Sequence, residues 1–164
     1  MVRPSRFRNI NWYPPLIGAG IRVVEHSPDM NAITVELKLH WWNRNIAGSQ
    51  FGGSLYMMCD PFFMAILLNH LGSDYIVWDK AASIQFLKPG RRKVRAHFYL
   101  SPEEIQHVRS EADAKGKCEP EYEVDILDDQ GLLIARVKKL LYVRRKDFVG
   151  GPKNLIQDKE AAPA

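Results

Sequence analysis

The sequence predicts an α+β domain, in which a curved antiparallel sheet of about six strands wraps around one central apolar helix. The first observation is the alternation of apolar and polar residues over positions 33–39, which is typical of a half-buried strand. The second is a single long apolar stretch at 54–71, hydrophobic on nearly every face and stopped by Gly72. The third is a series of turn motifs that divides the rest of the chain into strands.

Turn and capping motifs set the boundaries of the other elements. Ser101-Pro102-Glu103-Glu104 is a capping box, so a polar helix should begin there and end near Lys115. Proline, glycine and aspartate at 27–31, 88–91 and 128–131 mark turns between strands. The expected strands are residues 18–25, 32–41, 75–87, 93–100, 122–127 and 132–145.

Composition indicates one globular domain. The chain has 164 residues, of which 46% are hydrophobic and 26% charged. We expect an N-terminal extension at 1–16, the domain at 17–148 and a disordered tail at 149–164. The 23 basic and 19 acidic residues leave a net charge of only +4, which suits an anionic small molecule and does not indicate nucleic-acid binding.

We expect no metal site and no membrane association. Cys59 and Cys118 have no Cys or His at metal-ligand spacing, and the five histidines are scattered. The N-terminus carries arginines but no apolar core segment or small-residue cleavage site, which excludes a signal peptide. The apolar stretch is too short to span a bilayer. These features predict a cytoplasmic protein.

Gly52 and Gly53 open the apolar stretch. The first N–H groups of a helix have no intrahelical partner, and bare glycines let a ligand oxygen reach them. This is the geometry of an oxyanion hole. A tight turn into the helix, or close packing against a strand, would also require glycine, and the local features alone favour that structural alternative.

Asp60 is a lone carboxylate among apolar residues. Leaving it ionised and unpaired in a core would cost several kcal/mol, so it needs a partner, water or a catalytic role. Asp followed by Pro is also a good N-cap and first-turn pair, so a helix could start at Pro61. Alternatively, the helix begins near Gly53 and Pro61 kinks it.

The spacing of these residues bears on assembly. In a continuous helix Gly53 and Asp60 would lie two turns apart, roughly 10 Å along the axis. One reacting atom cannot touch both ends within a single chain. Two chains with antiparallel helices could bring the glycine end of one to the carboxylate of the other, so a catalytic interpretation requires a dimer.

The pattern Asn45-x-x-Gly48, three residues, Gly52-Gly53 and then Asp60 resembles the signature of hotdog-fold acyl-CoA thioesterases of the phenylacetyl-CoA and medium/long-chain type. The similarity continues through the strand and Pro-Gly turn at 84–90 and covers residues 17–145. The chain is similar in particular to an uncharacterised bacterial branch labelled tetrameric acyl-CoA thioesterase. That branch carries the Asp-Pro of 60–61 and the Trp-Asp-Lys of 78–80.

The resemblance implies a hotdog fold, a homodimer or tetramer, and an acyl-CoA substrate with coenzyme A as part of the substrate and no separate cofactor. An N–H of Gly52 or Gly53 would polarise the thioester carbonyl. Asp60 of the partner chain would activate water or attack directly, and Asn45 would position the water or the substrate. The residues expected to contact the substrate are Gln50, Phe51, Tyr56, Met64, Asp79, Ser83, Lys88, Arg91 and Arg92.

Two alternatives stay open. The basic residues at 88, 91 and 92 could meet CoA phosphates or form a solvated hairpin tip. Phe51 stands where the family usually has histidine, and Met64 where it often has a hydroxyl residue. These departures favour a non-catalytic acyl-CoA or lipid-binding protein as the second hypothesis. Dehydratase chemistry is disfavoured because it needs the missing histidine.

Overall fold

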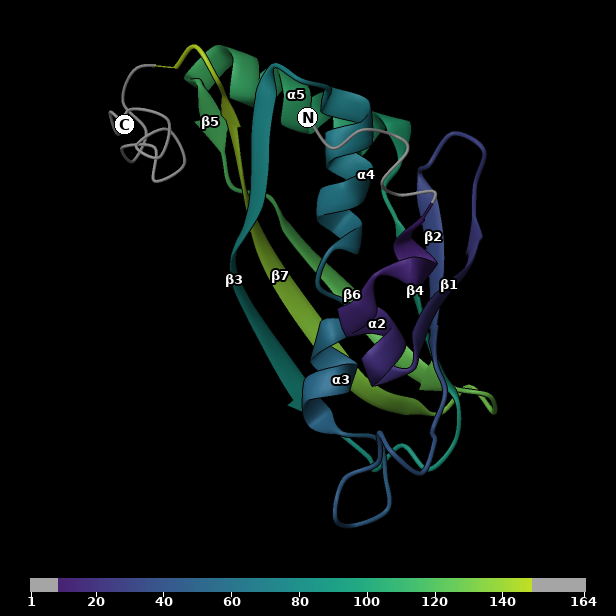
Figure 1. Ribbon diagram of the computed structural model, residues 1–164. Helices are drawn as coiled ribbons and strands as arrows, with labels where there is room; N and C mark the ends of the chain where they lie inside the picture. Colours follow the sequence, from purple (N-terminus) through teal and green to yellow (C-terminus); the bar gives the residue numbers. More distant parts are fainter. Residues whose placement is uncertain (1–8, 149–164) are drawn as a thin grey trace, which may run out of the picture.

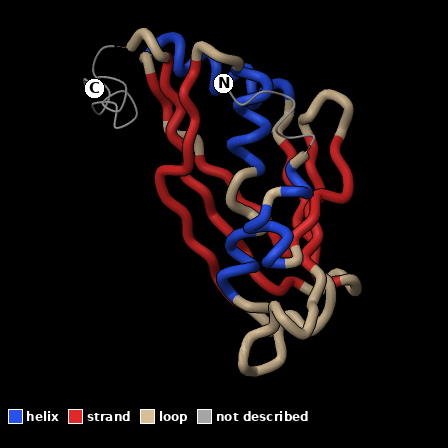
Figure 2. The backbone as a smooth tube through the Cα atoms, viewed as in Figure 1, coloured by secondary structure: helices blue, strands red, loops and turns tan. Residues whose placement is uncertain are grey.

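The computed structural model describes residues 9–148, and an antiparallel sheet wrapped around central helices dominates it (Figures 1 and 2). The sheet order is β1-β2-β4-β6-β7-β3, and the short β5 also pairs with β7. The strands are β1 (Ile21–His26), β2 (Ala32–Leu37), β3 (Tyr75–Phe86), β4 (Val94–Tyr99), β5 (Lys117–Cys118), β6 (Glu121–Asp128) and β7 (Leu133–Arg145). The helices are η1 (Ile10–Trp12), α2 (Pro14–Ala19), α3 (Gly52–Met57), α4 (Phe62–Leu71) and α5 (Pro102–Lys115).

The hydrophobic core lies between α4 and the inner face of the sheet. Phe62 and Ile66 of α4 are fully buried, as is Phe98 of β4. The rings of Phe62 and Phe98 lie 5.1 Å apart, centroid to centroid. Burying side chains of this size is the main favourable contribution to folding. The predicted architecture, a curved sheet around an apolar central segment, is therefore confirmed.

β3 lies at one edge of the sheet and pairs only with β7 along the sheet order. Its register shifts between Asp79 and Ala81, where the strand changes from half-buried to exposed. Near its end Phe86 is 57% exposed, and Leu87 just beyond it is 49% exposed. An edge strand with apolar exposed residues offers backbone and side-chain groups to a further strand or chain.

The peripheral helix α5 begins and ends where its sequence predicts. The Ser101 hydroxyl accepts a hydrogen bond from the Glu104 N–H at 3.1 Å, which is the expected cap. Gly116 ends the helix with a left-handed backbone, φ 77°. Ile105 and Val108 are buried on its inner side, so one face packs and the other stays exposed.

The central apolar stretch forms two helices, α3 and α4, because residues 58–61 do not continue α3. Two expected strand boundaries were wrong. Residues 18–20 belong to the end of α2 rather than to a strand, and residues 38–41 lie beyond the end of β2. Leu16 of α2 is buried in the core, and the expected domain bounds 17–148 stay a prediction. The predicted tail at 149–164 lies outside the described residues.

Candidate active site

Asp60 lies in the break between α3 and α4, with its side chain 53% exposed. The N–H of Cys59 donates to the Tyr56 carbonyl at 2.9 Å, and the N–H of Asp60 donates to the Met57 carbonyl at 3.2 Å. These short-range bonds close α3 as a tight turn. Pro61 has no N–H to continue the ladder, and α4 restarts when Ala65 donates to the Pro61 carbonyl at 2.8 Å.

Asp60 does not cap α4. The N-cap residue is Pro61, and no side chain makes a capping hydrogen bond there. The interpretation of Asp60 as an N-cap was therefore wrong. Instead its carboxylate contacts a lysine from the far side of the core. The Nζ atom of Lys139 lies 3.3 Å from Asp60 Oδ1 and 2.7 Å from Asp79 Oδ2.

Lys139, Asp79 and Asp60 form an ordered cluster, which we call the Lys139 cluster. Burial decreases in that order: the exposed fraction of the side chain is 0% for Lys139, 19% for Asp79 and 53% for Asp60. The ammonium also lies 5.3 Å from the centre of the Tyr56 ring, within the range of a cation–π contact. The cluster thus connects the sheet interior to the surface at Asp60.

The electrostatics of the cluster reflect burial and pairing. Burial raises the pKa of Asp79 above its ordinary value, although the Lys139 ammonium works against that shift. Burial alone would lower the pKa of Lys139, but the hydrogen bond to Asp79 and the charges of Asp79 and Asp60 raise it. The proton therefore stays on the amine. Within the described part of the chain, Asp79 Oδ1 is buried without a hydrogen-bond partner.

The glycine pair lies at the start of α3, close to two exposed phenylalanines. Ser54 and Leu55 donate the first helical hydrogen bonds to the Phe51 carbonyl, at 3.0 and 3.1 Å. A Cβ added at Gly52 would lie 3.0 Å from the Phe86 ring, and one at Gly53 would lie 2.5 Å from the Phe51 ring. Ring packing is thus one physical reason for glycine here, and the oxyanion role stays a prediction.

The loop before α3 is organised by two side chains that sequence reasoning assigned to catalysis or substrate. Asn45 Oδ1 accepts from the N–H groups of Ala47 and Ser49, and its amide donates to the Ser49 hydroxyl at 2.9 Å. Gln50 is only 3% exposed, and its amide donates to the carbonyls of Leu37 and Arg92. Both side chains thus support the loop, and their catalytic or substrate-binding role stays a prediction.

Comparison with known proteins identifies the family. A family model described as a domain of unknown function, DUF4442, matches residues 5–143. The chain belongs to the DUF4442 family. No curated protein matches the sequence.

Solved structures resemble the fold of this DUF4442 protein. A Pseudomonas aeruginosa protein described as a probable thioesterase is 23% identical, with a TM-score of 0.78 over 88% of this chain and 98% of that one. A thioesterase from Haemophilus influenzae is 13% identical, with a TM-score of 0.64, and the match covers 92% of this chain and 96% of that one. The E. coli PaaI protein of the phenylacetic acid degradation operon is 16% identical, with a TM-score of 0.59, and the match covers 90% of this chain and 93% of that one. The DUF4442 chain has the hotdog fold, as its sequence predicted.

Most other predicted substrate contacts lie on the surface. Lys88, Arg91 and Arg92 are exposed on the loop between β3 and β4, where Arg92 has Asp129 at 4.0 Å. Ser83 is exposed on β3. Phe51 is exposed before α3, whereas Met64 is partly buried against the core. Among the predicted contacts in residues 9–148, Tyr56 and Asp79 share a contact with Lys139, the residue that binds Asp60.

Lys139 is the residue that sequence reasoning missed. A signal was present, because Val137, Lys139 and Leu141 share one side of β7 by strand alternation, and the two apolar neighbours are fully buried. Alternation therefore places this lysine inward, while Lys138 faces solvent. No local pattern could say that its partners lie 60 and 79 residues earlier in the chain.

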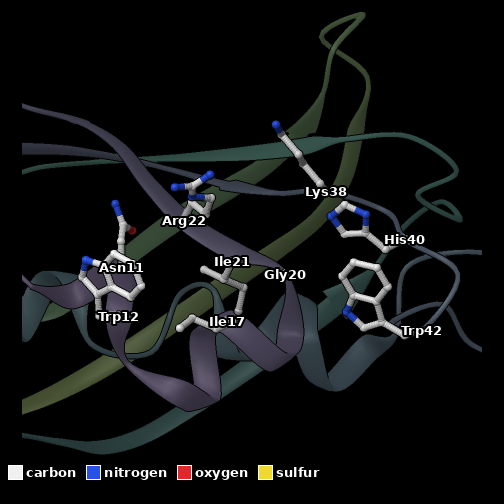
Figure 3. Close-up of a pocket in the computed structure, with 9 residues that line it drawn as sticks. All are labelled: Asn11, Trp12, Ile17, Gly20, Ile21, Arg22, Lys38, His40 and Trp42. Atoms are coloured by element: carbon white, nitrogen blue, oxygen red, sulfur yellow. The ribbon is translucent and has the colours of Figure 1, made fainter.

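A cavity of about 520 Å³ opens on another part of the surface, between α2, β1 and the loop after β2 (Figure 3). Trp12 and Trp42 lie at its two ends, and Arg22 and Lys38 lie on its rim. None of the predicted site residues lines it, so it is separate from the Lys139 cluster.

Within residues 9–148, no group of three or more His, Cys, Asp or Glu side chains is arranged to hold a metal ion. Nor does any helix in this part of the chain combine the length and hydrophobicity needed to cross a membrane.

Proposed function

We propose that the protein hydrolyses an acyl-CoA thioester, with Asp60 as general base or nucleophile. The observation that carries the proposal is the state of this carboxylate: one oxygen is fixed by a buried ammonium, while about half of the side chain is open to solvent. Carboxylates held at such a boundary are candidates for acid–base and nucleophilic work. The hotdog fold, shared with the H. influenzae thioesterase, supports this reaction class.

Either of two routes releases the CoA thiolate. As a general base, Asp60 takes a proton from water while that water attacks the thioester carbonyl. As a nucleophile, Asp60 attacks the carbonyl itself and forms a mixed anhydride, which water then hydrolyses. In both routes the carbonyl oxygen becomes negative. The N–H groups of Gly52 or Gly53 from the second subunit would stabilise it.

A homodimer completes this site. The solvent-facing carboxylate at Asp60 and the exposed apolar end of the edge strand β3, around Phe86 and Leu87, both support a second copy of the chain in contact here. The exposed cations Lys88 and Arg91 would then meet the phosphates of CoA.

The test is thiol release from acyl-CoA substrates of increasing chain length. Asp60→Asn should fold normally and lower turnover about a hundredfold or more, the usual contribution of a general base. Asp74→Asn is the matched control, because Asp74 is exposed on the loop before β3. Equal turnover by Asp60→Asn and wild type on the best substrate would remove Asp60 from the mechanism.

The second candidate function is acyl-CoA binding without hydrolysis. It is favoured by Phe51, an exposed apolar side chain where the resembling enzymes have histidine. Thermal stabilisation by acyl-CoA, with no thiol released from any chain length, would select this function over the first.

A further inference from the structure

Burying the Lys139 ammonium costs free energy, and the carboxylates around it offset that cost. Burying a charged lysine costs several kcal/mol unless a carboxylate pairs with it. Asp79 is the closer partner, at 2.7 Å, and Asp60 the more distant, at 3.3 Å. Asp79 therefore neutralises most of the ammonium, and Asp60 receives a weaker, orienting contact.

The charges of the cluster do not cancel. One ammonium meets two carboxylates, which leaves one negative charge, and the more exposed carboxylate is the one able to carry it. Other titratable groups surround Lys139 without changing that sum at neutral pH, because cysteine and tyrosine are uncharged there. The groups facing it from the packed elements are Tyr56 and Cys59 near the end of α3, Asp60 at the junction, Asp79 of β3 and Tyr122 of β6.

We propose that Lys139, neutralised by Asp79, is the positioning residue for Asp60: it binds Oδ1 and leaves Oδ2 to act on the substrate. This inference rests on the proposed function of Asp60. Asp60 Oδ2 has no cation partner in residues 9–148. The buried pair thus fixes the direction of the carboxylate without removing its charge, which is the requirement for a base or nucleophile.

A purely structural ion pair, one that only ties the α3–α4 junction to β7, would show the same distances. The two roles differ in their charge dependence. If the charges of the cluster act on the active carboxylate, removing the ammonium leaves two adjacent carboxylates, and their repulsion favours a proton shared between them. Removing Asp79 has the opposite effect, because Asp60 then has the ammonium to itself.

The experiment measures the pH dependence of kcat/KM for thiol release. Lys139→Met should move the acidic limb of the profile upward by about one pH unit or more, and Asp79→Asn should move it downward. The double variant, Lys139→Met with Asp79→Asn, leaves Asp60 alone and should return the limb toward wild type. Lys138→Met is the matched control, since Lys138 is 65% exposed and its ion pair within residues 9–148 is with Glu123 at 3.7 Å, outside the Lys139 cluster.

The unfolding free energy of every variant is measured beside the profile. Opposite shifts for Lys139→Met and Asp79→Asn, reversed in the double variant, support the positioning role. An unmoved acidic limb in folded Asp79→Asn overturns it, even if Lys139→Met fails to fold. A fully active Asp60→Asn would instead overturn the proposed function, so the two failures are distinguishable.

Discussion

The peripheral helix α5 and the junction between α3 and α4 are built on opposite principles. α5 has a serine cap at Ser101 and a left-handed glycine at Gly116, and both are encoded next to the residues that they serve. The junction has no capping side chain, and its only charged residue, Asp60, is held by Lys139 from a strand 79 residues later. Residues next to the helix ends therefore determine where α5 begins and ends, whereas tertiary contacts determine the structure of the junction between α3 and α4.

The comparison shows where a carboxylate is free for function. At a cap, a polar side chain is occupied by the backbone that it stabilises. At the junction, Asp60 makes no such bond, because Pro61 is the N-cap of α4 and no side chain caps this helix. The Asp-Pro pair of residues 60–61 interrupts an apolar stretch that otherwise has the length of one helix. That interruption thus marks the candidate site rather than a helix start.

The largest expected contrast between the two regions is in thiol reactivity. Burial raises the pKa of Cys59, at the junction, to about 12, and that of Cys118, beside the end of α5, to about 11, against an ordinary 9.0. Only the thiolate reacts, so at pH 8 labelling should be roughly a thousandfold slower than for a free thiol at Cys59 and roughly a hundredfold slower at Cys118. Mass spectrometry of labelled peptides should find Cys118 modified first, and early labelling of Cys59 would contradict a tightly packed junction.

A smaller contrast is expected in stability. Ser101→Ala removes the cap of α5 and should lower the free energy of unfolding by about 1 kcal/mol. Asp60→Asn removes no cap and leaves Lys139 paired with Asp79, so it should cost less than Ser101→Ala. Urea unfolding of both variants measures the difference. A larger loss for Asp60→Asn would show that the ion pair, and not core packing, holds the junction together.

Much of this fold follows from the sequence. The boundaries of α5 came from its capping box, and the strands came from alternation and turn residues within a few positions. The same reasoning placed Asp60 and the glycine pair in one segment. It could not find the break at 58–61, because a proline allows either a kink or a new helix and the choice depends on distant packing.

The side chains of the loop before α3 show the same limit. Asn45 and Gln50 have the chemistry of substrate-binding residues, yet their amides are used by the loop, the end of β2 and the β3–β4 loop. The bonds of Gln50 span 13 and 42 residues, so they leave no local pattern, whereas those of Asn45 stay within its own loop. Strand alternation predicts that Lys139 faces inward. Its role, however, depends on Asp79 and Asp60, and these residues come close to it only in the folded chain.

The central claim is that the acid of one subunit acts with the α3 start of the other, and mixed dimers test it most directly. Gly52→Val, which crowds the α3 start beside Phe86, and Asp60→Asn should each be inactive as homodimers. Co-expressed with different tags, they should regain about a quarter of wild-type turnover, because half of the dimers are mixed and each mixed dimer keeps one intact site. No regained turnover from purified mixed dimers would place both groups in a single chain and contradict the account.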